Sequence, residues 1–93
     1  MKFEELNFKP QHIDLGGERA VIKFDNGYGA SVITGGELSY TSHSRPYEIA
    51  VLKGDDLCYD TPITDDVLGY QSECSVQRVL NQIAELPPAT NLK

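Results

Sequence analysis

The dipeptide Asn26-Gly27 constrains this chain more than any other sequence feature, because it separates two runs of β-branched and apolar residues. The run before it, 19–24, reads RAVIKF, and the run after it, 28–34, reads YGASVIT. Asn-Gly tolerates the positive φ angles of a type I′ turn, so the sequence predicts a β-hairpin with that turn. One face of the first strand is then apolar, and it carries Ala20, Ile22 and Phe24.

Two further runs extend the predicted sheet beyond the hairpin. Residues 47–52, YEIAVL, alternate apolar side chains, and residues 57–59, LCY, form a short final strand. Gly29 indicates a bulge or a close approach of another element within the second strand. The connections are short, and no helical pattern separates the runs. We therefore expect an antiparallel β-meander of about four strands over 19–59, preceded by an arm or short strand in 1–18.

The last strongly patterned segment, 72–86, predicts one amphipathic helix. Ser72 is a suitable N-cap, and Pro87-Pro88 ends the segment. A shorter helix is predicted from Thr64 to Gly69. The apolar stripe of the long helix must be buried against the sheet, so the chain is expected to form a single α+β domain over 1–93 with a tail at 87–93. The stripe has helical spacing and consists of Val76, Val79, Leu80 and Ile83.

The charge balance argues against direct binding to nucleic acid. The chain has 14 Asp and Glu against 8 Lys and Arg, and its formal net charge is −6. Affinity for a phosphate backbone depends on clustered cations, which this sequence lacks. The acidity suits solubility or a basic partner. No secretory signal and no membrane-length apolar run is recognisable, so we expect a cytoplasmic protein that does not bind membranes.

Motifs for catalysis and cofactor binding are missing from the sequence. Cys58 and Cys74 have no metal-ligand spacing and are expected to be reduced, buried thiols. No G-x-S-x-G elbow, phosphate-binding loop or dinucleotide fingerprint occurs. We therefore expect no cofactor and no metal, and the sequence offers no motif for an enzymatic activity.

Two groups of residues remain as candidate sites. The first is Tyr40, His43 and Arg45 in the polar segment 35–45, where aromatic and guanidinium groups suit a protein interface; the alternative is an ordinary solvated loop. The second group lies in the acidic segment that ends the predicted sheet. It consists of Asp60, Asp65 and Asp66, whose carboxylates could gather around a cation, although turn and capping roles explain them as well.

Three strings, FDNGYGASVI, YEIAVL and YDTPITDDVLGY, followed by the amphipathic helix, resemble a family of small uncharacterised proteins of bacteriophages and prophages. The resemblance covers roughly 19–86, and its most specific part is 59–67. Related sequences place several acids after the Ser or Thr that begins the helix, whereas this chain has Glu73-Cys74-Ser75 there.

The resemblance implies an accessory protein in the bacterial cytoplasm that engages a host component, and it carries over no catalytic residue. The leading hypothesis is a non-enzymatic binding module for a host protein. Its rivals are a small-molecule or metal-dependent activity at the carboxylates, and a structural homodimer that uses an unpaired sheet edge.

Overall fold

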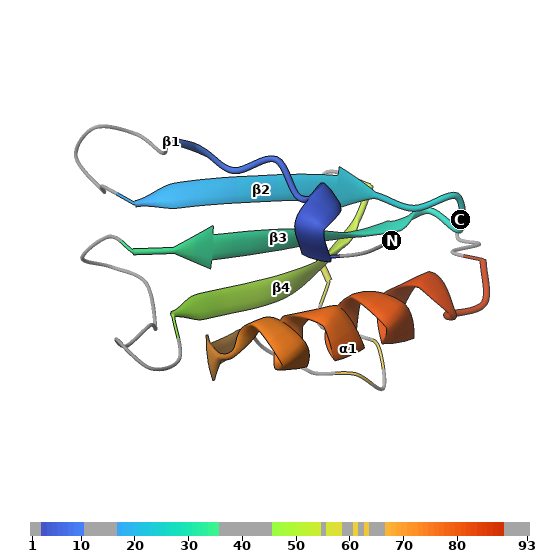
Figure 1. Ribbon diagram of the computed structural model, residues 1–93. Coiled ribbons are helices and arrows are strands. Elements are labelled where there is room, and N and C mark those ends of the chain that lie inside the picture. Colours follow the sequence, from blue (N-terminus) through green and yellow to red (C-terminus); the bar gives the residue numbers. More distant parts are fainter. Residues whose placement is uncertain are drawn as a thin grey trace.

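The computed structural model describes residues 3–10, 17–35, 46–54, 56–58, 61, 63 and 67–88. These residues form an antiparallel sheet with one C-terminal helix packed on it, which confirms the predicted α+β class (Figure 1). The helices are a 3-10 helix, η1 (Phe3–Glu5), and α1 (Glu73–Ala84). The strands are β1 (Lys9–Pro10), β2 (Glu18–Lys23), β3 (Tyr28–Thr34), β4 (Tyr47–Lys53), β5 (Asp56–Leu57) and β6 (Leu68–Gln71).

The described sheet has six strands, so the prediction of about four was too low. Its order is β1-β2-β3-β4-β5, and β6 also pairs with β4. β5 and β6 share the outer edge of β4, where β5 lies opposite Lys53 and β6 opposite Tyr47. The sequence pattern left an arm or a short strand open for 1–18, where β1 lies, but it missed β6. The two strands are only two and four residues long and contain Pro10 and Gly69, which are unusual in strands.

The predicted short helix over 64–69 is wrong at its end, because Leu68 and Gly69 belong to β6. Thr64, Asp65 and Asp66 lie outside the described residues. Residues 68–71 form a strand because the outer edge of β4 supplies hydrogen-bond partners for their backbone. A local sequence pattern does not reveal that edge. The predicted strand 57–59 is likewise shifted: β5 is not the final strand, and it is Asp56–Leu57.

The hairpin between β2 and β3 is confirmed, but its turn is not type I′. A type I′ turn needs a positive φ at both of its central residues, here Asn26 and Gly27. Gly27 has a φ of +90°, but Asn26 does not have a positive φ, since Tyr70 is the one non-glycine residue that does among the described residues. The Phe24 N–H donates to the Tyr28 carbonyl at 2.8 Å, and the Gly27 N–H donates to the Phe24 carbonyl at 3.2 Å. This is a three-residue loop in which a left-handed glycine follows a type I turn.

The predicted close approach at Gly29 is also present. A Cβ atom at this position would collide with the backbone carbonyl oxygen of Ile22 on β2. Only glycine therefore fits between the paired backbones at the start of β3.

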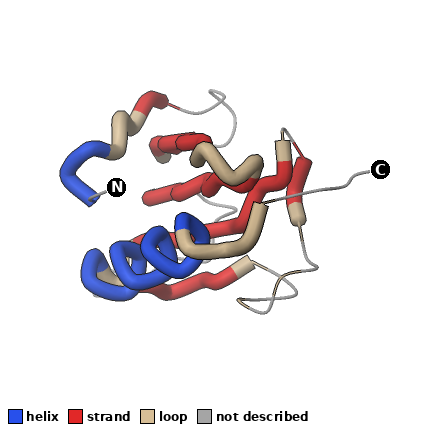
Figure 2. Tube along the Cα trace, turned by 90° about the vertical axis from the view of Figure 1, so that its right-hand side faces the viewer, coloured by secondary structure: helices blue, strands red, loops and turns tan. Residues whose placement is uncertain are grey.

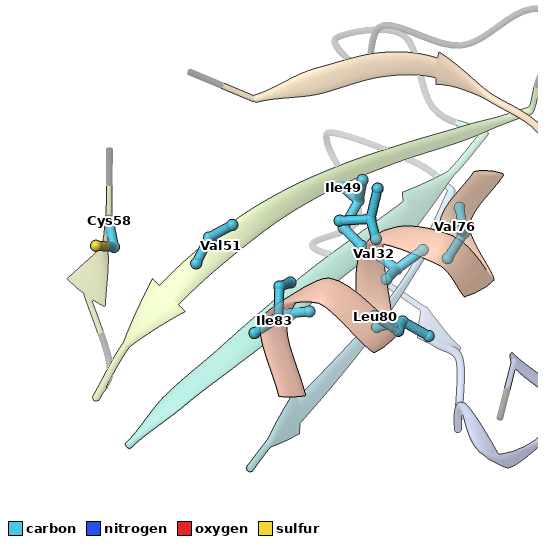
Figure 3. Close-up of a cluster of buried hydrophobic side chains, with 9 residues drawn as sticks. Val32, Ile49, Val51, Cys58, Val76, Leu80 and Ile83 are labelled. Atoms are coloured by element: carbon cyan, nitrogen blue, oxygen red, sulfur yellow. The ribbon is translucent and has the colours of Figure 1, made fainter. Parts of the chain in front are cut away.

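Helix α1 covers one face of the sheet (Figures 1 and 2). The Ser72 hydroxyl accepts the Ser75 N–H at 3.2 Å, which confirms the predicted N-cap. The four residues of the predicted stripe are all buried, and Figure 3 shows three of them against Val32 and Ile49 of the sheet. The helix ends at Ala84, two residues before the predicted end. The core therefore lies between α1 and the face of the sheet that carries Ala30, Val32, Ile49 and Val51.

The N-terminal arm completes the cover of this face. Phe3 and Phe8 pack against the core and against Tyr47, with ring centroids 5.1 Å and 6.0 Å from the tyrosine ring. The Phe3 N–H donates to Oε1 of Gln77 on α1 at 2.5 Å. The helix and the arm thus leave the opposite face of the sheet as the place to look for a binding surface.

Candidate functional site

The opposite face of the sheet carries no helix in the described part of the chain, and we call it the helix-free face. Strand register places its residues in three rows across the sheet. The row nearest the β2–β3 turn has Lys23, Gly29, Leu52 and Leu57; the middle row has Val21, Ser31 and Ala50; the far row has Arg19, Ile33 and Glu48. None of these residues belongs to the core cluster under α1.

At the centre of the helix-free face the side chains are buried, and one of them is polar. Ser31, Ala50 and Leu52 are buried, and Ser31 is the one buried polar residue among the described positions. Its hydroxyl accepts a hydrogen bond of 2.9 Å from Nε of Arg19 on the neighbouring strand. The guanidinium is therefore held over the sheet in a fixed orientation, while Arg19 as a whole remains exposed.

A β-bulge in β6 extends the far row. Tyr47 pairs with Gln71 and Ile49 pairs with Leu68, so Glu48 alone lies opposite the two residues Gly69 and Tyr70. Alternation back from the Tyr47–Gln71 pair places Tyr70 on the helix-free side, because the extra residue of the bulge interrupts the alternation that starts at Leu68. Tyr70 has a φ of +55°, a conformation that is uncommon for an aromatic residue, and its side chain is 51% exposed. The bulge thus turns a tyrosine outward at the edge of the sheet.

The exposed apolar side chains of the described residues gather on this same face. The large hydrophobic residues that are exposed are Val21 (46%), Leu57 (53%) and Tyr70 (51%). They come from β2, β5 and β6, and the register places all three on the helix-free side. Scattered apolar residues are normal on a protein surface, but three on one side of a sheet, beside an oriented arginine, resemble an interface.

The sequence-predicted binding residues Tyr40, His43 and Arg45 lie outside the described residues. The segment that contains them leaves β3 after Thr34 and enters β4 at Tyr47, and these two residues are paired. The far row, with Ile33 and Glu48, is the adjacent position on both strands. The attachment points of segment 36–45 therefore lie next to the far row of the helix-free face.

The carboxylate candidates Asp60, Asp65 and Asp66 also lie outside the described residues. Among the residues that the structure describes, no group of three or more His, Cys, Asp or Glu side chains is placed to hold a metal ion. The two cysteines are free thiols. Cys58 is buried as expected, whereas Cys74 is exposed, because it lies on the outer side of the first turn of α1.

The aromatic cluster on the core face has the one clearly perturbed ionisable group of the described residues. Burial raises the pKa of the Tyr47 phenol above its ordinary value of 10.0, and the nearby negative charge of Glu73 raises it further. The phenol is therefore neutral at physiological pH and acts as an amphipathic packing group, with no tendency toward acid–base chemistry near pH 7.

The arrangement on the helix-free face suits contact better than chemical transformation. Its far row presents a cation, an aliphatic side chain, a carboxylate and an aromatic ring: Arg19, Ile33, Glu48 and Tyr70. Neither a cysteine nor a histidine lies in its three rows, so the described face has no strong nucleophile or neutral-pH base. Such a surface can provide apolar area and oriented hydrogen bonds to another chain.

Sequence reasoning missed Arg19, Val21 and Leu57 as candidate binding residues. The alternation that assigned Ala20 and Ile22 to the core also placed Arg19 and Val21 on the other face, so that signal was present in the sequence. Leu57 and Tyr70 needed the pairing of β5 and β6 with β4, which no local pattern reveals.

Comparisons with protein-family models, with curated proteins and with solved structures found no match to this chain. Within the described residues no helix has the length and apolar character needed to cross a membrane.

Proposed function

We propose that this protein is a non-catalytic binding module that engages a protein partner through the helix-free face. One observation carries the proposal: Val21, Leu57 and Tyr70, the exposed large hydrophobic residues of the described chain, all lie on that face. Tyrosine and arginine are enriched among the residues that dominate binding energy, so Tyr70 and Arg19 are the expected anchors.

The charge of the chain indicates the kind of partner. With a net charge of −6, the protein attracts a basic surface over a distance of about one Debye length, roughly 8 Å at physiological salt. In keeping with the phage resemblance, we propose that the partner is a host protein in the bacterial cytoplasm, bound without a cofactor. Segment 36–45 begins and ends beside the far row, so Tyr40, His43 and Arg45 are proposed to extend the same contact surface.

The test is affinity capture from bacterial lysate, followed by binding measurements with the purified partner. We expect Tyr70→Ala combined with Val21→Ser to weaken binding at least tenfold, because both residues are exposed and their loss leaves the core intact. The matched control is Gln82→Ala, an exposed position on α1 at the opposite side of the protein. Melting curves of all three proteins should be similar.

Two outcomes would contradict the proposal. The first is a purified complex whose affinity is unchanged by the double substitution on the helix-free face. The second is a partner that binds equally fast at about 50 mM and about 500 mM salt, since charge-steered association slows as screening increases. A stable homodimer in sedimentation experiments, with no other partner captured, would favour the structural homodimer over a binding module for a host protein.

A further inference from the structure

Asn26 joins the β2–β3 turn to the C-terminal end of α1. Its side-chain Nδ2 donates to the carbonyl of Ile83 at 2.9 Å, to that of Ala84 at 3.4 Å and to that of Leu86 at 3.1 Å. Its Oδ1 accepts the Tyr28 N–H at 3.0 Å. The last carbonyls of a helix lack the usual i+4 partners. The Ile83 carbonyl also accepts the Leu86 N–H at 3.1 Å, and the Asn26 amide supplies a further donor at this end of the helix.

The same amide lies beside the residue that makes asparagine chemically least stable. Gly27 follows it, is exposed, and has no Cβ atom to shield its backbone nitrogen. We propose that Asn26 is a deamidation site, and that its conversion to aspartate or isoaspartate releases the C-terminal end of α1 from the hairpin turn. This inference is independent of the proposed binding function, because Asn26 contacts the end of α1, which packs on the opposite face of the sheet from the proposed binding surface.

The reaction needs only water and hydroxide. The Gly27 backbone nitrogen loses its proton and attacks Cγ of Asn26, a carbon–nitrogen bond forms, the Cγ–Nδ2 bond breaks, and ammonia leaves with that proton. Water then opens the resulting succinimide at one of its two carbonyls. The products are an aspartate, or an isoaspartate in which the backbone runs through the side chain, and nothing is oxidised or reduced.

Conversion exchanges a hydrogen-bond donor for a negative charge at an unfavourable place. The carboxylate cannot donate to the three carbonyls, and it faces the negative end of the helix dipole. No basic residue lies in the last turn of α1 to compensate, and the C-cap residue is the acidic Glu85. The product is therefore repelled by the same atoms that the asparagine binds.

The native fold sets the rate of the reaction. The Gly27 N–H is hydrogen-bonded to the Phe24 carbonyl, and the amide is held by α1, so attack requires the turn to open first. Each opening of the turn exposes Asn26-Gly27 to attack. Once Asn26 has been converted, the turn no longer closes as readily onto the end of α1. The consequence is a slow, one-way loosening of the helix with the age of the protein.

The first experiment follows the wild-type protein at 37 °C and mildly alkaline pH, using peptide mass spectrometry and an isoaspartate assay. Asn7 and Asn81 are internal controls, because they precede Phe8 and Gln82. We expect conversion at Asn26 at least tenfold faster than at either control, and faster still in urea. Conversion of Asn26 at the rate of the controls, or conversion in urea alone, would overturn the proposal.

The second experiment tests the consequence with variants that mimic the product. We expect Asn26→Asp to lower Tm by on the order of 10 °C at pH 7, further than Asn26→Ala, which loses the hydrogen bonds without adding charge. At about pH 3 the carboxyl is protonated and the two variants should melt at similar temperatures. An Asn26→Asp protein that melts like wild type, or no lower than Asn26→Ala at pH 7, would show that the amide does not hold the helix.

Discussion

Leu80 is the position where the packing of α1 on the sheet can be tested most directly. Its side chain is 0% exposed and lies in the cluster that also contains Val32 and Ile49 (Figure 3). Leu80→Ala removes buried methyl and methylene groups and leaves a cavity, because the sheet on the other side cannot collapse fully into it. Comparable substitutions in protein cores cost about 3 to 5 kcal/mol.

That loss is large relative to the stability of the whole protein. At roughly 0.05–0.15 kcal/mol per residue, a chain of 93 residues has a free energy of unfolding of roughly 5–14 kcal/mol. We therefore expect Leu80→Ala to remove about a fifth or more of the total and to lower Tm by at least about 10 °C.

Urea unfolding followed by far-UV circular dichroism measures the effect, with Gln82→Ala as the matched control on the exposed side of the same helix. The control should change the free energy of unfolding by less than about 0.5 kcal/mol. If the two variants had equal urea midpoints, the assignment of this helix face to the core would be wrong.

Three further predictions concern single features of the fold. Gly29→Ala should cost roughly 1–3 kcal/mol in urea unfolding, because its Cβ collides with the Ile22 carbonyl; an unchanged midpoint would place β2 and β3 differently. Ser72→Ala should cost about 1 kcal/mol through loss of the N-cap, and a helix content and midpoint equal to wild type would contradict the capping hydrogen bond. Since the folded-state pKa of Tyr47 is raised, the folded protein retains that proton longer than the unfolded chain; stability should therefore fall as pH rises above about 10, and Tyr47→Phe should reduce this fall in alkaline melts.

Local patterns were sufficient for the elements that carry their own signal. Alternation in 19–24 and 47–52, the turn residues at Asn26-Gly27, and the stripe from Val76 to Ile83 each predicted an element that the structure contains. These signals are strong because a strand or helix with one apolar face has essentially one way to bury it. The α+β class and the core face follow from these elements alone.

Segments whose structure depends on a distant partner were predicted wrongly or missed. Leu68 and Gly69 form a strand because the outer edge of β4 lies beside them, and that edge is set by residues 47–53. The left-handed φ of Tyr70 arises in the same pairing, since one extra residue must fit opposite Glu48. No short-range propensity favours an aromatic residue in that conformation.

Asn26 shows the same division within one residue. The sequence by itself determined that a chain reversal occurs there, because Asn-Gly favours a turn wherever it stands. Only the tertiary structure decided the type of turn and the role of the amide, since the three carbonyls that it binds belong to a helix end 57 to 60 positions later. The candidate binding face has the same origin: its side chains were visible in the sequence, but strand pairing alone brings Val21, Leu57 and Tyr70 to one side.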